Sequence, residues 1–115
     1  MTQQLQVPEQ LSPNPPDLTS KFFRGLADPT RVKILYLLLE GDRNVGELVE
    51  SVGSSQGRVS SHLACLRWCG YVISYREGKN VYYTLADPRV KELLELAQRI
   101  LTDNAERIIA CQIIR

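Results

Sequence analysis

The chain has 115 residues, with 14 Lys and Arg against 13 Asp and Glu, and 43% of its residues are hydrophobic. This length suits a single domain, and a formal net charge of +1 confines any nucleic-acid binding to a local basic patch. A single His excludes a His-rich metal site, and an odd number of Cys, three, argues against a disulfide scaffold. No apolar run is long enough to cross a bilayer. We therefore expect a cytoplasmic protein with reduced thiols and no membrane partner.

Residues 1–17 are expected to form a disordered N-terminal tail, because Gln and Pro alternate there and favour neither helix nor strand. Residues 18–115 are expected to form the folded domain. Its first helix is short and should begin near Leu18, whose spacing to Phe22 and Leu26 is helical.

Capping signals predict where the next two helices begin. Asp28 followed by Pro29 is a strong start signal, because Pro lacks an amide donor that would be unsatisfied at the first helical position. This second helix should end at Gly41. Asn44 and Glu47 have the spacing of a capping box and predict a third short helix.

A fourth helix is predicted from Ser55, its N-cap, to Gly70. Its buried stripe should consist of Val59, Leu63 and Leu66. The third and fourth helices are joined by only a few residues, which is the dimension of a helix-turn-helix whose second helix enters the major groove of DNA.

With that stripe buried, the fourth helix turns outward four side chains that can reach base edges or phosphates. These are Gln56, Arg58, Ser61 and His62. Taken alone, the four residues are equally compatible with an ordinary solvated helix face.

The hydrophobic period changes after the fourth helix. Residues 71–76 and 80–85 are rich in β-branched and aromatic types and flank a turn-like segment, which predicts a hairpin. Residues 52–83 carry four cations against one anion, and two of the cations, Arg76 and Lys79, lie near the hairpin tip. This local positive charge favours phosphate contact, so we interpret the hairpin as a wing beside a DNA-reading helix. Its tyrosines are expected to pack within the hairpin rather than stack on bases.

Asp87 followed by Pro88 repeats the start signal and predicts a long last helix. One face of this helix carries Val90, Leu93, Leu94, Ala97, Ile100 and Leu101. The stripe could continue to Cys111, or it could end near Asp103, which with Glu106 would cap a separate helix. The whole pattern predicts a mainly α fold with a β-hairpin wing.

Several motifs, in this order, resemble the ArsR/SmtB family. They are Leu26-Ala27-Asp28-Pro29-Thr30-Arg31, Ile34-Leu35, Val59-Ser60-Ser61-His62-Leu63, Gly70-Tyr71-Val72, Arg76-Glu77-Gly78-Lys79 and Tyr82-Tyr83. The resemblance implies a winged helix-turn-helix homodimer that represses an operator until an inducer binds, with the first and last helices at the dimer interface. An enzyme is the least expected class, because one His, no phosphate-binding loop and no recognisable carboxylate pair leave nothing to assign as catalytic.

Two of the three cysteines, Cys65 and Cys69, are four residues apart, so they should lie one above the other on the fourth helix and could hold one metal ion. The alternative is that both act as small buried hydrophobes. The surrounding residues 63–70 resemble the cadmium- and lead-sensing CmtR-type branch of the family. In that branch a third Cys comes from the C-terminal region of the partner subunit, and Cys111 is the only other Cys here. Whether Cys111 would bind in cis or from the partner is left open by the sequence.

Three soft thiolates without an evident fourth ligand suit a thiophilic inducer, namely Cd(II), Pb(II) or Hg(II), or trivalent arsenic, with no organic cofactor. Two other metal sites known in the family are absent, because residues 45–50 contain no Cys and residues 88–115 contain no His. Two alternatives remain, a thiol redox or persulfide sensor on the same fold and an interaction module without DNA binding.

Overall fold

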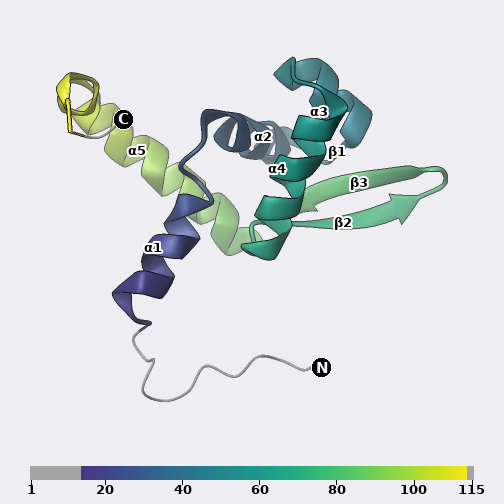
Figure 1. The fold of residues 1–115 in the computed structure, drawn as a ribbon, viewed down its shortest axis with the longest axis horizontal. Coiled ribbons are helices and arrows are strands. Elements are labelled where there is room, and N and C mark those ends of the chain that lie inside the picture. Colours follow the sequence, from purple (N-terminus) through teal and green to yellow (C-terminus); the bar gives the residue numbers. More distant parts are fainter. Residues whose placement is uncertain (1–13, 114–115) are drawn as a thin grey trace.

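The computed structural model describes residues 14–113, within which five helices accompany a small antiparallel sheet (Figure 1). The elements in chain order are α1 (Pro16–Arg24), α2 (Pro29–Glu40), β1 (Arg43–Asn44), α3 (Val45–Val52), α4 (Gln56–Trp68), β2 (Val72–Glu77), β3 (Asn80–Leu85) and α5 (Pro88–Ala110). The expected fold class, mainly α with a hairpin wing, is confirmed. Pro16 and Asp17, which we assigned to the tail, form the first turn of α1, and the rest of the expected tail, residues 1–13, lies outside the described residues.

The predicted helix caps are present at the start of α2, α3 and α4. Asp28 Oδ1 accepts from the backbone amides of Thr30 and Arg31 at 2.8 and 3.1 Å. Asn44 and Glu47 form the reciprocal capping box, with bonds of 2.8 and 2.9 Å. A third cap, from Ser55, accepts from a backbone amide in the first turn of α4 at 3.2 Å. These local bonds satisfy amides that a helix N-terminus leaves without intrahelical partners.

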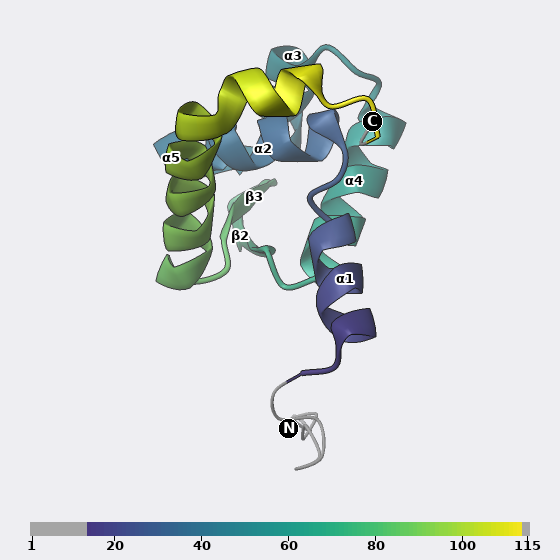
Figure 2. The same cartoon turned by 90° about the vertical axis from the view of Figure 1, so that its left-hand side faces the viewer.

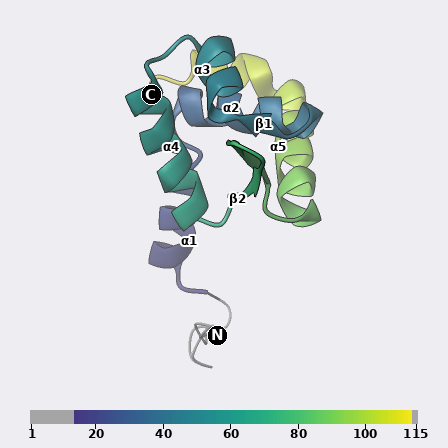
Figure 3. The same cartoon turned by 90° about the vertical axis from the view of Figure 1, so that its right-hand side faces the viewer.

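The hydrophobic core lies where α2, α3, α4 and the start of α5 meet the base of the hairpin. Figure 3 shows these helices around the hairpin. The predicted stripe of α4 is buried, since Val59, Leu63 and Leu66 are at most 1% exposed. Gly53 ends α3 with a φ of +79°, a left-handed conformation that glycine adopts without strain. This tight turn places α4 across α3 as the second helix of a helix-turn-helix.

The hairpin of β2 and β3 projects from the helical body as a wing (Figure 1). A two-residue loop joins its strands, and Gly78 supplies the positive φ of +63° that this loop requires. A third strand, β1, pairs with β3 through only two residues, Arg43 and Asn44. We did not predict β1, because two residues carry no periodicity and their pairing depends on a strand far along the chain.

Helix α5 combines the two alternatives left open by the sequence. It is traced from Pro88 to Ala110, but Asn104 has non-helical backbone angles (φ −124°, ψ 15°), one residue after Asp103. Figure 2 shows the segment beyond this kink turned at a steep angle to the first part of α5. Val90 and Leu94 are buried and Leu93 is half-buried, whereas Ala97, Ile100 and Leu101 are exposed in the single chain. None of the described helices has the length and hydropathy required to cross a membrane.

Candidate nucleic-acid interface and thiol site

The proposed DNA-reading side chains of α4 and the wing are exposed on the elements that carry them. Gln56, Arg58 and Ser61 are exposed on the first half of α4, and Arg76 and Lys79 are exposed on the wing. The buried stripe on the opposite side of α4 holds this helix against the core. Five of the six residues selected from the sequence are therefore free of the core and accessible to a ligand.

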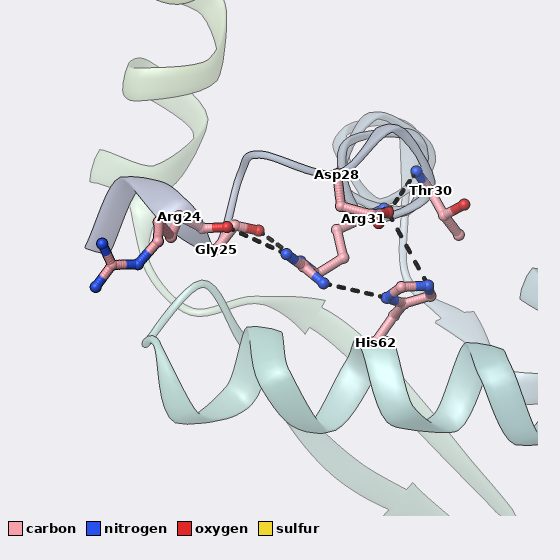
Figure 4. Close-up of polar contacts among 6 residues, drawn as sticks. All are labelled: Arg24, Gly25, Asp28, Thr30, Arg31 and His62. Carbon is pink, nitrogen blue, oxygen red and sulfur yellow. Dashed lines mark hydrogen bonds and ion pairs between the residues drawn. The ribbon is translucent and has the colours of Figure 1, made fainter. Parts of the chain in front are cut away.

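His62 is the sixth, and it is half-buried rather than fully exposed. Its ring turns back toward the N-terminus of α2, where Nδ1 lies 3.3 Å from Arg31 Nη1 and Nε2 lies 4.0 Å from Asp28 Oδ1 (Figure 4). The His62 side chain is 21% exposed. The reason is tertiary, because α2 packs beside α4 along the edge of the buried stripe and supplies polar partners there.

Arg31 is the centre of a polar cluster that we did not predict (Figure 4). Its Nε donates to the carbonyl oxygen of Gly25 at 2.8 Å and its Nη2 to that of Arg24 at 3.1 Å. The amide of Arg31 also donates to Asp28, and this bond is the main cause that holds the pKa of the Asp28 carboxyl below its usual value. The cluster thus joins the end of α1, the start of α2 and the middle of α4.

Cys65 and Cys69 come together as their spacing predicted, and both are half-buried. Burial raises the pKa of the Cys69 thiol, and Cys65 raises it further through its proximity and a hydrogen bond between the two side chains. Arg31 and Lys21 act in the opposite direction. Adjacent soft sulfur donors on one helix suit a thiophilic ion, provided that both thiols lose their protons.

Cys69 also packs tightly against the junction between α1 and α2. A Cβ atom at Gly25 would lie 3.2 Å from Cys69 Sγ and 3.0 Å from Cε2 of Tyr71. Tyr71 is fully buried, and its hydroxyl donates to the carbonyl oxygen of Phe22 in the last turn of α1 at 2.8 Å. Cys69 therefore lies directly against the end of α1.

Cys111 follows the last residue of α5 and is half-buried. Figure 1 shows this end of α5 away from α4. Among the described residues of one chain, no three His, Cys, Asp or Glu side chains gather in a way that could hold a metal ion. The single chain thus brings Cys65 and Cys69 together but does not bring Cys111 to them.

Curated relatives share much of this sequence. A protein named a probable mercury resistance operon repressor from Streptomyces lividans is 51% identical over 96 residues, which cover 84% of this chain and 77% of that protein. The transcriptional regulator CmtR of Mycobacterium tuberculosis is 44% identical over 73% of this chain and 72% of its own length. A cadmium resistance regulatory protein, a CadC homologue from Staphylococcus aureus, is 45% identical over 73% of this chain and 69% of its own length.

Solved structures share the fold. The Mycobacterium tuberculosis protein Rv0081 superposes with a TM-score of 0.76 at 39% identity, covering 82% of this chain and 95% of that one. A homodimeric winged helix-turn-helix DNA-binding domain from Mycobacterium bovis gives a TM-score of 0.73 at 28% identity, covering 88% and 92%. The family profile of bacterial regulatory proteins of the arsR family matches residues 28–74, which span α2 to the middle of β2. Together with the helix-turn-helix and wing, these similarities show that the chain belongs to the ArsR family, whose members are transcriptional regulators and not enzymes.

Proposed function

We propose that this protein is a metal-responsive transcriptional repressor of the bacterial cytoplasm that binds operator DNA as a homodimer and leaves it when a thiophilic ion binds. The observation that carries the proposal is the contact between the Cys65 and Cys69 side chains on α4. The same helix presents Gln56, Arg58 and Ser61, so an ion held by the two sulfurs acts directly on the helix that reads DNA. His62 is left out of this DNA-reading set because its ring is engaged by α2.

The DNA interface consists of α4 inserted in the major groove and the wing beside it, with Arg76 and Lys79 on phosphates. A dimer formed through α1 and α5 presents two such units to a two-fold operator. Exposed apolar side chains on both helices support this dimer, and they include Leu18, Phe22, Phe23, Ile100 and Leu101. The homodimeric domain from Mycobacterium bovis supports it further.

Cys111 of the partner subunit is our proposed third ligand. Its distance from α4 within one chain leaves the partner as the source, because the two subunits of a dimer can bring residues from different helices together. Among the candidate ions we place Hg(II) first, since the relative that is 51% identical is named a mercury resistance operon repressor. Thiolates also bind Cd(II) and Pb(II), and cadmium appears in the name of a second relative.

The experiment is a titration of the reduced protein bound to a DNA fragment of its own promoter region, with Hg(II), Cd(II) and Pb(II) added in turn. We expect release of DNA together with thiolate-to-metal charge-transfer absorption. The only Trp of the chain, Trp68, is 91% exposed and adjacent to Cys69, so its fluorescence provides a second report of binding. Cys65→Ser and Cys69→Ser should abolish release and leave metal-free DNA binding largely intact. Full metal-induced release of Cys65→Ser would refute the site.

A thiol redox sensor is the second candidate, because the two thiols already contact each other. A disulfide between them requires distortion of α4, since Cβ atoms at this helical spacing are roughly 5–6 Å apart and a disulfide needs about 3.8 Å. Mild oxidation followed by mass spectrometry and a DNA-binding assay separates the two functions. Release of DNA by oxidant in the presence of a chelator, with no response to metal, would favour the redox sensor.

A further inference from the structure

One guanidinium connects three helices beside the thiol pair. Arg31, on α2, donates to the carbonyl oxygens of Gly25 and Arg24 at the end of α1 and contacts His62 on α4 (Figure 4). Each of its three nitrogens is used for a different partner. A Lys ammonium at this position could not span the same three acceptors, because it lacks the planar fork.

In the contact between Arg31 and His62, the donor and the acceptor can be assigned. A guanidinium can only donate hydrogen bonds, so Nδ1 of His62 is the acceptor and carries no proton in this contact. The other ring nitrogen, Nε2, then faces Asp28 Oδ1 at 4.0 Å. The two ring nitrogens therefore have different partners on α2 and its N-cap, and together they orient α4 relative to the start of α2.

The thiol pair lies against the same junction. Cys69 Sγ packs on Gly25, whose carbonyl oxygen is the closest acceptor of Arg31. His62 lies one helical turn before Cys65 on α4. An ion bound to Cys69 needs space in front of the sulfur, and the backbone at Gly25 occupies part of that space. A shift of α4 relative to the α1–α2 junction on metal binding would separate His62 from Arg31.

We propose that Arg31 and His62 form a latch that stabilises the DNA-binding orientation of α4 against the metal-bound orientation. This inference rests on the proposed function and names the residues that couple its two sites. Neither residue binds metal or DNA in this scheme, and both act by positioning α4. Because the latch exists only in the DNA-binding conformer, its loss shifts the equilibrium toward the metal-binding conformer.

Because metal binding and DNA binding are thermodynamically linked, loss of the latch changes the two affinities in opposite directions. General damage to the fold does not have this effect. Loss of the latch tightens metal binding and weakens metal-free DNA binding, since the two ligands select opposite conformers. A substitution that only loosens the structure weakens both. The net contribution of an ordinary intramolecular hydrogen bond corresponds to a change of up to about tenfold in an equilibrium constant.

The test compares Arg31→Lys, His62→Leu and His62→Asn with the wild type. Hg(II) affinity is measured by competition with a monothiol, read by charge-transfer absorption, and DNA affinity is measured without metal. We expect Arg31→Lys and His62→Leu to raise Hg(II) affinity several-fold, up to about tenfold, and to lower DNA affinity by no more than the same factor. His62→Asn, whose side-chain oxygen can replace Nδ1 as the acceptor, should stay near the wild type. Lys33→Ala, which removes an exposed cation from the same helix, is the control for loss of charge.

An unchanged or lower Hg(II) affinity in Arg31→Lys and His62→Leu would overturn the latch. Equal Hg(II) and DNA affinities for His62→Leu and His62→Asn would also overturn it. Thermal unfolding identifies any variant that fails to fold. If either Arg31→Lys or His62→Leu does not fold, the affinities of the other variant test the latch. A wild-type protein that neither binds Hg(II) through its thiols nor leaves DNA would instead refute the proposed function. The two failures are therefore distinguishable.

Discussion

Asp28 shows how one side chain serves both the local helix and the tertiary structure. It caps α2 through two backbone amides and also faces the ring of His62 from α4. Because its carboxylate accepts these bonds, the folded protein favours the ionised form, which is why its pKa is lowered. The cap therefore stabilises the fold in a pH-dependent way.

We predict that Asp28→Ala lowers the free energy of unfolding by about 1 kcal/mol, the typical cost of losing an N-cap. The charge-dependent part of the stabilisation is present above 3.8, the ordinary pKa of an Asp carboxyl, and is lost as the pH falls through the lowered pKa of the folded protein. Asp28→Asn, which still accepts hydrogen bonds, should keep most of the stability at neutral pH and show a flatter pH dependence below about pH 4. Urea unfolding of the three proteins between about pH 3 and 7 checks this, and identical pH profiles for the wild type and Asp28→Asn would contradict it.

In the proposed interface, DNA recognition is divided between α4 and the wing. Arg58 is exposed on the first half of α4, where a side chain reaches base edges, whereas Lys79 lies in the wing loop, where a side chain reaches phosphates. The wing is anchored to the turn before β1, because the hydroxyl of Tyr75 donates to Asp42 Oδ2 at 2.7 Å. This hydrogen bond raises the pKa of Tyr75 to about 12, so the phenol keeps its proton at any physiological pH.

We predict that Arg58→Ala lowers operator affinity by about 1–3 kcal/mol and relaxes sequence specificity, because it removes a base contact. Lys79→Ala should weaken binding to operator and unrelated DNA alike, and it should reduce the slope of affinity against salt concentration by about one counterion. Fluorescence anisotropy at several salt concentrations distinguishes these outcomes. If neither substitution changed binding, the DNA surface would lie elsewhere on the molecule.

At the scale of the whole molecule, α1 and α5 leave apolar side chains exposed that the proposed dimer would cover. Helix α1 has no buried residue, and Phe23 and Ile100 are 49% and 54% exposed. Apolar side chains left uncovered on these two helices mark an interaction surface. The proposed dimer would supply the two recognition helices that a two-fold operator requires.

We predict that Leu101→Glu on α5 converts the dimer to a monomer and strongly weakens operator binding, because a charge replaces an apolar contact at the interface. Ile73→Glu, on β2, is the control for the oligomeric state, since Ile73 is also exposed, at 51%, but belongs to neither α1 nor α5. Sedimentation velocity at micromolar concentration gives the oligomeric state. A wild-type monomer under these conditions would remove the basis for the dimer.

Mixed dimers test whether Cys111 acts from the partner subunit. One subunit carries Cys111→Ser and the other carries Cys65→Ser with Cys69→Ser, so a complete three-sulfur site can form only between subunits. We predict that such heterodimers regain one metal site with the charge-transfer absorption of the wild type, whereas neither parent homodimer does. A heterodimer that behaves like its parents would indicate that Cys111 is not a ligand in trans.

The sequence by itself determined the features whose signals are local. Helix starts at Asp28, Asn44 and Ser55 follow from side chains that bond to amides two or three residues away. The burial of the α4 stripe and the contact between Cys65 and Cys69 follow from helical periodicity alone. Such signals operate within one element, so they can be recognised before the fold is known.

Only the tertiary structure decided what depends on packing between elements. The direction of His62 follows from Arg31, which is 31 residues away in the chain, and the pairing of β1 follows from β3. The separation of Cys111 from the other thiols depends on the path of α5 beyond its kink at Asn104. Periodicity states which face of a helix is buried, but it does not state which polar groups another helix brings to the edge of that face.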